Sequence, residues 1–311
     1  MVEVPRAAAA TVLDVPRKIT AVLTGFAFLE SPRWHEGRIW FSDFYTYRVF
    51  SAAGDGSDLR VEAEVPEQPS GLGWLPDGRL LVVSMRDRRL LRRQDDGALV
   101  VHAELSDHIG GFPNDMVVDH LGRAFVGNFG IDFRIQSTFE PATLLRVDPD
   151  GTITEVARDL WFPNGSVITD GGTLVVGETF GNRVSAFDVA ADGSLGNRRT
   201  WAKFGELPTD RELEALRRQR VVAPDGCCLD AEGALWMADA DGGPVRRVRE
   251  GGEIVEEINP GTGAFACMLG GDDGRTLFIC AAPDYRQEII GERRDASLLA
   301  VRVDIPYAGL P

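Results

Sequence analysis

The sequence has little of what nucleophilic enzymes and zinc proteins usually carry. Its 311 residues include only four histidines and four cysteines. The cysteines lack zinc-finger spacing, and no G-x-S-x-G segment marks a strained nucleophilic serine. These absences argue against a Ser-His-Asp hydrolase. We interpret the cysteines as reduced, buried thiols of a cytoplasmic protein; they are Cys227, Cys228, Cys267 and Cys280.

Basic charge and long apolar runs are also scarce. Lys and Arg number 33 against 48 Asp and Glu, which gives a formal net charge of −15. Such a chain repels phosphate backbones, so we expect no nucleic-acid partner. No apolar run approaches the roughly 20 residues that cross a bilayer, so we expect no membrane partner. The N-terminal segment has no uninterrupted apolar core and does not resemble a signal peptide. No pattern in the sequence indicates an oligomeric state.

Short apolar runs separated by turns are abundant instead. Asp-Gly and related pairs between alternating apolar residues are the strongest local signal for β-hairpins. One unit recurs at intervals of about 40 to 60 residues and consists of an opening motif, an apolar strand, a Gly turn and a second strand. Its six copies occupy residues 30–43, 69–84, 113–128, 163–178, 224–239 and 266–281.

The repeat predicts an all-β fold, a six-bladed β-propeller of four-stranded antiparallel blades. We expect one domain over residues 1–311, with about 1–20 as an N-terminal extension. Segment 18–25 is alternatively an outer strand that completes the last blade. Residues 209–220 contain helix formers and a cap candidate, which predicts a short helix between blades 4 and 5. The insertion that contains it, 205–222, is either a lid or a solvent-exposed connection.

Side-chain oxygens recur just before the first strand of four units. In a propeller that strand lines the central channel, so these residues converge at one mouth of the channel. Asn and Asp also favour turns, but this alternative explains neither Glu30 nor the convergence. Two carboxylates placed together repel each other unless a cation neutralises them. The residues are Glu30, Asn114, Asn164 and Asp225, from blades one, three, four and five.

Oxygen ligands of this kind predict one divalent cation. Ca²⁺ is the ion that we expect, with Mg²⁺, Mn²⁺ and Zn²⁺ as alternatives. Over residues 28–303 the sequence resembles the SMP-30/gluconolactonase/LRE-like family of six-bladed propeller hydrolases, through "LESPRW", "FPND", "FPNG" and "APDG". The resemblance implies that Glu30, Asn164 and Asp225 bind one catalytic metal. It also implies that Asn114 reaches both metal and substrate.

The function implied by this resemblance is a divalent-metal-dependent hydrolase that opens a lactone or related ester ring. The metal would act as a Lewis acid, Asp225 would activate water, and Asn114 would orient the carbonyl or the water. A small-molecule lactone or ester is then the expected partner. The same site would also serve organophosphate or phosphoester hydrolysis or a non-hydrolytic biosynthetic step, and a metal-binding propeller can be a non-enzymatic binding module.

One position departs from the family pattern. Sugar-lactone hydrolases commonly carry an Arg two residues before the Asn, where this chain has Phe112. A phenyl ring removes the guanidinium donors and leaves an apolar wall, unless it merely packs under its loop. We therefore expect a substrate less polar than a sugar lactone. The candidate substrate-binding residues are Asn114, Phe112, Phe129, Trp161 and Phe180, and Phe133 and Phe162 are expected at the same rim.

One insertion and several polar residues near the mouth are weaker candidates for the site. The insertion 129–141 in blade three faces this mouth and contributes two of the aromatic residues. Four residues end second strands, where a structural hydrogen-bonding role is favoured over contact with the metal ligands; they are Asp43, Asn128, Glu178 and Asp239. His108 is a rim candidate by its closeness to Asn114 in sequence, with an ordinary surface His as the alternative.

Overall fold

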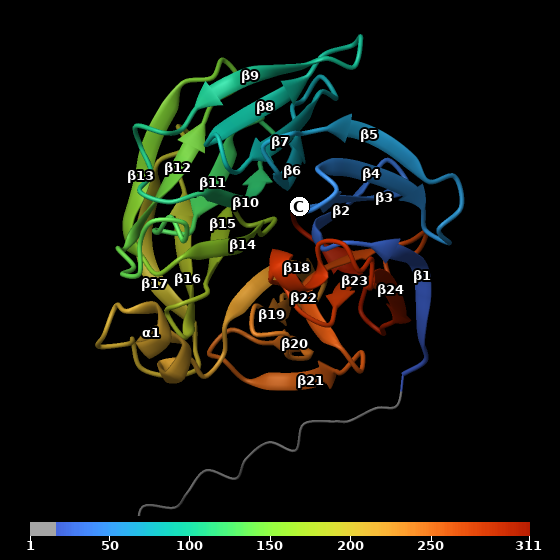
Figure 1. Cartoon of the computed structure of the whole chain (residues 1–311). Helices are drawn as coiled ribbons and strands as arrows, with labels where there is room; N and C mark the ends of the chain where they lie inside the picture. Colours follow the sequence, from blue (N-terminus) through green and yellow to red (C-terminus); the bar gives the residue numbers. More distant parts are fainter. Residues whose placement is uncertain (1–16) are drawn as a thin grey trace, which may run out of the picture.

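Six antiparallel sheets surround a central axis in the computed structural model, which describes residues 17–311 (Figure 1). The prediction of a six-bladed propeller with four-stranded blades is confirmed. Blade 1 consists of β2 (Leu29–His35), β3 (Arg38–Asp43), β4 (Arg48–Ala53) and β5 (Arg60–Glu64). Blade 2 consists of β6 (Pro69–Trp74), β7 (Leu80–Ser84), β8 (Arg89–Arg93) and β9 (Leu99–Glu104). Blade 3 consists of β10 (Pro113–Val118), β11 (Ala124–Asn128), β12 (Ala142–Val147) and β13 (Ile153–Leu160).

The second half of the ring repeats this order. Blades 4 and 5 are β14 (Pro163–Ile168), β15 (Thr173–Glu178), β16 (Arg183–Val189) and β17 (Leu195–Lys203); and β18 (Pro224–Asp230), β19 (Leu235–Asp239), β20 (Val245–Val248) and β21 (Ile254–Ile258). Blade 6 is β22 (Gly263–Gly270), β23 (Thr276–Ala282), β24 (Ala296–Arg302) and β1 (Ile19–Phe26).

Burial falls from the axis outward and explains the strand sequences. Every residue of the inner strands β10, β14 and β18 is buried, because each packs against both neighbouring blades. The outer strand β9 is buried at only one of its six positions, and it exposes Val100 and Val101 as well as Glu104. The core therefore lies between the blades, where apolar side chains of adjacent sheets pack face to face.

Both ends of the described chain join the ring. Strand β1 pairs antiparallel with β24, with Ile19 opposite Val301 and Phe26 opposite Ala296. Segment 18–25 thus supplies the outer strand of blade 6, which was one of the two alternatives; residues 1–16 of the expected extension lie outside the described residues. The C-terminal tail forms β25 (Tyr307–Ala308), which pairs with the end of β18 far from the mouth. No pattern in the sequence indicates this pairing of the tail.

An extra residue interrupts each inner strand near its start. Pro113 pairs with Asn128 and Met116 with Val126, so three steps on β10 match two steps on β11. The same one-residue irregularity recurs in β14 and β18, and register shifts lie at matching places in β2, β6 and β22. Such a β-bulge bends the strand and redirects a side chain. In blades 3, 4 and 5 this bulge contains Asn114, Asn164 and Asp225, the residues that the repeat identifies as site candidates.

Gly165 and Gly226, the glycines of two opening motifs, lie within strands and not in turns. Asn164-Gly165 and Asp225-Gly226 sit in β14 and β18, so the turn alternative is wrong. A Cβ on Gly165 would lie 2.3 Å from the Asp225 carbonyl oxygen, and one on Gly226 would lie 2.4 Å from the Cβ of Ala266. Glycine is needed there because adjacent inner strands approach too closely for any side chain.

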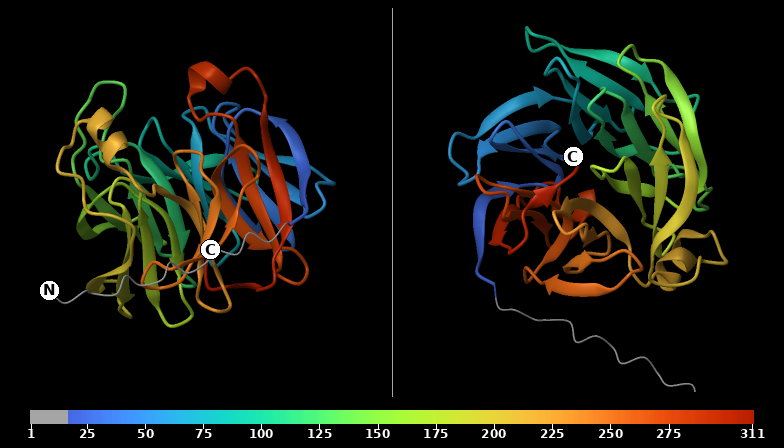
Figure 2. Two further views of the ribbon diagram at one scale, coloured as in Figure 1. Left: turned by 90° about the horizontal axis from the view of Figure 1, so that it is seen from below. Right: turned by 180° about the vertical axis from the view of Figure 1, so that it is seen from behind.

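Three insertions rise on one face, which we call the mouth (Figure 2). The predicted helix between blades 4 and 5 is present as α1 (Leu213–Gln219), shorter than expected. The insertion 129–141 separates β11 from β12, as predicted. A third one, residues 283–295 with α2 (Gln287–Ile290), joins β23 to β24 and was not anticipated. No helix among the described residues is long and apolar enough to cross a membrane.

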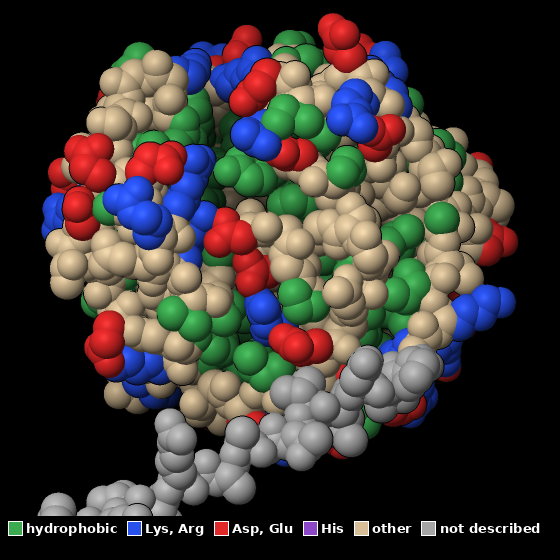
Figure 3. Space-filling view, turned by 60° about the horizontal axis from the view of Figure 1, so that its bottom comes forward, with side chains coloured by type: hydrophobic (Ala, Val, Ile, Leu, Met, Phe, Trp, Pro, Cys, Tyr) green, Lys and Arg blue, Asp and Glu red, His purple; other side chains and the backbone are tan. Residues whose placement is uncertain are grey.

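Charge is distributed in small local pairs. Figure 3 shows acidic and basic side chains interspersed with apolar ones on the face that it presents. Many arginines pair with a carboxylate two residues away in the same turn, such as Arg79 with Asp77 and Arg286 with Asp284. The four cysteines, all within the described part of the chain, are buried and free, as expected for reduced thiols.

Candidate functional site

A row of hydrogen-bonded polar side chains crosses the inner strands at the mouth. Ser70 Oγ donates to Asn114 Oδ1 at 3.1 Å, and Asn114 Nδ2 donates to Asn164 Oδ1 at 2.8 Å. Asn164 Nδ2 then donates to Asp225 Oδ1 at 2.6 Å. All four side chains are buried, and each comes from the position after the opening proline of its strand, in blades 2 to 5. We call these four residues the polar row.

Thr179 fixes the centre of the polar row from behind. Its hydroxyl accepts a hydrogen bond from Asn164 Nδ2 at 3.0 Å and donates one to the Pro224 carbonyl at 2.6 Å. Thr179 is 1% exposed and follows β15, so blade 4 orients its own asparagine and also holds the first residue of β18. The amide of Asn164 therefore has little rotational freedom.

Glu30 faces the polar row from blade 1. Burial raises the pKa of Glu30, and the nearby carboxylates of Asp225 and Asp115 raise it further. Burial is also the largest cause that raises the pKa of Asp225, against a smaller opposing effect of its hydrogen bond from Asn164. The two predicted carboxylate ligands thus lie close enough to repel each other, and the structure brings together all three predicted metal ligands.

A buried ion pair neutralises the third carboxylate of this region. Arg33 Nη2 lies 2.5 Å from Asp115 Oδ1, and both side chains are at most 5% exposed. Arg33 also donates to the carbonyls of Leu72 and Met116, so it ties blades 1, 2 and 3 together. Within residues 17–311, no Lys or Arg forms an ion pair with Glu30 or Asp225. Among the described residues, Glu30 and Asp225 are therefore acids in a buried setting without a paired basic side chain.

This donor set suits a hard divalent cation. It offers two carboxylates without a basic partner and amide groups beside them, and no thiolate or imidazole. The described residues contain no group of three or more His, Cys, Asp or Glu side chains placed to hold a metal. A cation at the mouth would therefore depend on the amide oxygen of Asn164 as well as on Glu30 and Asp225.

Aromatic side chains form a wall beside the polar row. Phe129 lies 4.3 Å from Phe162 between ring centroids, and Phe162 lies 5.2 Å from Phe180. Phe162 and Phe180 are each 5% exposed, which corresponds to the packing alternative for both. Phe129 and Trp161 are only partly buried. We call this wall the rim cluster; it consists of Phe129, Phe139, Trp161, Phe162, Phe180 and Leu216.

The first two insertions supply Phe129, Phe139 and Leu216 to the rim cluster, and they contact each other. Phe139 and Leu213 each donate a backbone hydrogen bond to the other insertion, at 2.9 Å and 3.0 Å, and Thr138 pairs with Glu212. Leu216 of α1 is fully buried in the cluster. On its other side, Arg217 Nη2 donates to the Tyr285 hydroxyl at 3.3 Å, so α1 also contacts the third insertion.

The comparisons with known proteins agree with the fold and with the family that the sequence resembles. The family model described as "SMP-30/Gluconolactonase/LRE-like region" matches residues 28–283. The chain belongs to this family. Pentonolactonase XacC of Haloferax volcanii is 28% identical over 292 residues, which cover 91% of this chain and 92% of that protein. A 6-deoxy-6-sulfogluconolactonase of Pseudomonas putida is 26% identical over 302 residues, with 91% and 93% covered.

A solved relative shares the fold. The calcium-binding protein regucalcin of Agrobacterium tumefaciens superposes with a TM-score of 0.73 at 20% identity, covering 94% of this chain and 96% of that one. At this identity the match shows the architecture alone.

Against the pattern of the family, Phe112 is not an exposed apolar wall. Its side chain is 8% exposed. The guanidinium of Arg134 lies over the ring at 4.5 Å from its centroid, and that of Arg88 lies at 6.0 Å. The interpretation that position 112 leaves an apolar surface is therefore wrong, because two cations from elsewhere in the sequence cover the ring.

The residues at the ends of the second strands serve the blades themselves. Asp43 accepts hydrogen bonds from the backbone N–H groups of Ala27 and Phe28 at 3.1 Å and 3.0 Å. Glu178 and Asp239 pair with arginines on the third strand of their own blade, and Asn128 Nδ2 donates to the Thr143 carbonyl. These contacts match the structural role that was favoured.

His108 was a candidate from the sequence, whereas Ser70, Thr179 and Arg33 were not. His108 is half-buried and its ring lies 3.9 Å from Glu155 of β13, which corresponds to the surface alternative. Ser70 was missed, although it occupies the same repeat position as Asn114 and Asn164. The register of the repeat was the signal that could have found it. Thr179 and Arg33 carry no such signal, because their partners are distant in sequence.

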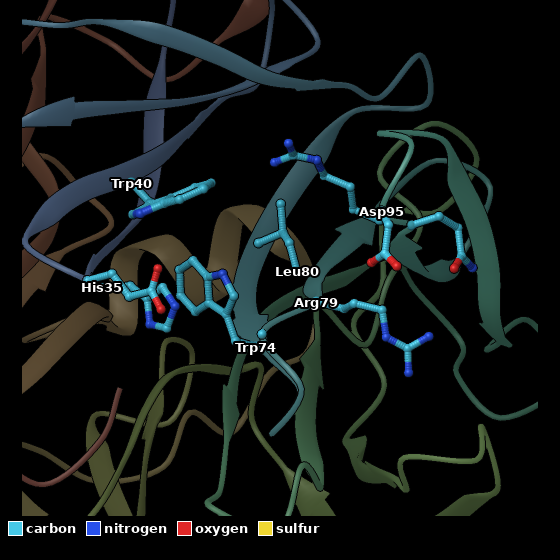
Figure 4. Close-up of a pocket in the computed structure, with 10 residues that line it drawn as sticks. His35, Trp40, Trp74, Arg79, Leu80 and Asp95 are labelled. Carbon is cyan, nitrogen blue, oxygen red and sulfur yellow. The ribbon is translucent and has the colours of Figure 1, made fainter.

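A separate hollow lies at the opposite end of blades 1 and 2 (Figure 4). It has a volume of about 230 Å³ and is lined by the strand-connecting turns of these blades. His35 stacks on Trp74 at 3.9 Å between ring centroids. This hollow is formed by the far ends of strands whose other ends carry the polar row, so it is distinct from the candidate site.

Proposed function

We propose that the protein is a divalent-metal-dependent hydrolase that opens a lactone ring. The observation that carries the proposal is the pair of uncompensated acids, Glu30 and Asp225, beside a fixed row of amides. Membership of the family and relatives that are named lactonases support the choice of reaction. Regucalcin, a structural neighbour described as calcium-binding, supports Ca²⁺ as the first ion to test.

In this proposal Glu30, Asn164 and Asp225 hold the cation. A bound divalent ion would supply Lewis-acid polarisation of the ring carbonyl, worth several kcal/mol of transition-state stabilisation. The protein contributes preorganisation, because Thr179 and Asn114 restrict the Asn164 amide before any ligand arrives. Side chains that are already oriented lose little conformational entropy on binding.

We propose Asp225 as the general base. Asn164 occupies its Oδ1, which leaves the other carboxylate oxygen to accept a proton from water. Burial raises the pKa of Asp225 above its usual range, which makes its carboxylate a stronger base. Asn114 lies next in the polar row and would orient the carbonyl or the water, since Ser70 and Asn164 hold its amide from both sides.

The rim favours an amphiphilic substrate, whereas Phe112 alone led to the expectation of a substrate less polar than a sugar lactone. Phe129 and Trp161 are partly exposed and would contact the carbon skeleton of the ring. Phe180 and Phe112 are buried and would support that surface from below. We propose that α1 acts as the lid, because it closes the same wall and contacts the third insertion.

The test combines metal analysis with a substrate panel. Purified protein is analysed for bound metal and then assayed with lactones, aryl esters and phosphotriesters, before and after chelation and after Ca²⁺, Mg²⁺, Mn²⁺ or Zn²⁺ is restored. We expect lactone hydrolysis that chelation abolishes and one of these ions restores. Turnover that chelation leaves unchanged would contradict the proposal. Preference for phosphotriesters, or metal binding without any turnover, would replace it with the phosphoester or binding-module alternative.

A further inference from the structure

Two arginines lie over Phe112, the position at which sugar-lactone hydrolases of the family commonly carry an arginine. Arg134 belongs to the insertion 129–141, and Arg88 belongs to the loop between β7 and β8 in the neighbouring blade. Their guanidinium groups lie 4.5 Å and 6.0 Å from the centroid of the Phe112 ring. Two positive groups over one aromatic face gain cation–π stabilisation from it. An arginine at position 112 would repel both.

A buried carboxylate holds the pair in place. Asp132 Oδ1 accepts from Arg134 Nε at 3.0 Å, and Asp132 Oδ2 accepts from Arg134 Nη2 at 2.7 Å and from Arg88 Nη2 at 3.2 Å. Asp132 is 2% exposed, and Gln136 Oε1 accepts a hydrogen bond from its backbone N–H. The two arginines therefore have a rigid anchor although they come from different blades.

The contacts with Asp132 leave at least one guanidinium nitrogen of each arginine without a hydrogen-bond acceptor among the described residues, and they offset only one of the two positive charges. Within residues 17–311, Arg134 Nη1 and Arg88 Nη1 have no hydrogen-bond partner. The Arg134 side chain is 56% exposed and that of Arg88 is 24% exposed. Two cations share one carboxylate, and the next acid that acts on Arg134 is the exposed Glu67. Arg286 pairs one to one with Asp284, whereas Arg38 and Arg60 share Asp58 in the way that Arg134 and Arg88 share Asp132.

The unused donors lie within reach of the polar row. Phe112 precedes Asn114 by two residues, so their Cα atoms are at most about 7 Å apart. Arg134 stacks directly on Phe112, whereas Asn114 is the second member of the polar row. A group bound by Arg134 and Arg88 would thus lie at the mouth on the side of blades 2 and 3, the blades that contribute Ser70 and Asn114 to the polar row.

We propose that Arg134 and Arg88 form an anion-binding subsite, and that the preferred substrates are lactones with an anionic substituent on the side of the ring away from the carbonyl. Carboxylate, sulfonate and phosphate groups share the chemistry that a pair of guanidinium groups recognises. This inference rests on the proposed lactonase function. It names Arg134 as the main determinant of specificity and Phe112 as its support.

The kinetic test uses two lactones with the same ring, glucono-1,5-lactone and its 6-phosphate, with metal-loaded protein. We expect a higher kcat/KM for the charged lactone. Arg134→Gln should reduce that preference roughly 10- to 100-fold, mainly through KM, because it removes one charge-assisted contact. The matched control is Arg218→Gln, an exposed arginine on α1. An unchanged preference in Arg134→Gln and Arg88→Gln would overturn the inference.

A binding test separates this inference from the proposed reaction. Calorimetry on chelated protein compares 6-phosphogluconate with gluconate, which differ only in the phosphate. We expect tighter binding of the phosphorylated acid in the wild type, and a loss of the difference in Arg134→Gln and at 0.5 M salt, where charge is screened over about 4 Å. Equal binding of the two acids by the wild type would overturn the subsite. If the wild type hydrolyses no lactone but still binds 6-phosphogluconate more tightly than gluconate, the proposed lactonase reaction is wrong and the anion-binding subsite is supported.

Discussion

The polar row and the rim cluster lie side by side at the mouth, yet they arise in opposite ways. Each member of the polar row occupies the same place in its blade, next to the same bulge. The rim cluster is instead assembled from two irregular insertions that pair with each other and from the loops that flank β14 and β15 of blade 4. Chemistry that all members of such a fold need can reside in the repeat, whereas the choice of substrate can reside in the insertions.

The largest effect should follow from removing an acid at the mouth. We expect Asp225→Ala to lower kcat by about 10²- to 10⁴-fold and Glu30→Gln to lose bound metal. The fold should survive both changes, because neither acid pairs with a basic group that would be left alone. Metal content, kcat and thermal unfolding measure these outcomes. The control is Asp107→Asn, an exposed carboxylate. Full turnover that resists chelation in either variant would end the metal hypothesis.

The rim should respond to Leu216→Ala. This side chain is fully buried in the rim cluster, so its truncation should cost about 2–5 kcal/mol of local stability. If the rim cluster serves the substrate and not the reaction, KM should rise while bound metal stays constant. Arg218→Ala on the exposed face of α1 is the control. Loss of metal in Leu216→Ala would show that the two regions are not independent.

The strand geometry behind the polar row can be tested with one methyl group. Gly165→Ala places a Cβ 2.3 Å from the Asp225 carbonyl oxygen, and overpacking of this kind costs about 1–3 kcal/mol. We expect a lower free energy of unfolding together with weaker metal binding, because Asp225 must move. Gly110→Ala is the matched control, since a Cβ there meets nothing within 4 Å. Equal stability of the two variants would mean that the inner strands can separate.

The smallest effect concerns the end of the polar row. Ser70→Ala removes the hydrogen bond to Asn114 Oδ1, worth about 1 kcal/mol, and should lower kcat roughly fivefold. Ser84→Ala removes a buried hydroxyl without a hydrogen-bond partner from the same blade and should leave the rate unchanged. If the two variants behave alike, Ser70 does not orient Asn114.

Much of the fold could be predicted because its signals are local and repeated. Turn pairs and alternating runs mark each hairpin, and the shared register places Asn114, Asn164 and Asp225 on neighbouring strands. Two features could not be read this way. The bulges that direct these side chains depend on pairing with the second strand, and Arg134 reaches Phe112 through a loop whose path no local pattern specifies. The effect of Phe112 was therefore misjudged although its position was noticed.

Strand β1 gives the ring an order of assembly. Thr20 bonds to the carbonyl of Ala300, a partner 280 residues later in the chain. During synthesis the first strand must wait, as an unpaired edge, until nearly everything else has left the ribosome. The four blade strands of each of the first five sheets come from contiguous chain, and only β25 joins blade 5 later, whereas the sixth sheet needs both ends of the ring. Closure is thus a late, non-local event that is slow by topology, and an incomplete nascent chain would expose an edge to which strands of other molecules can add.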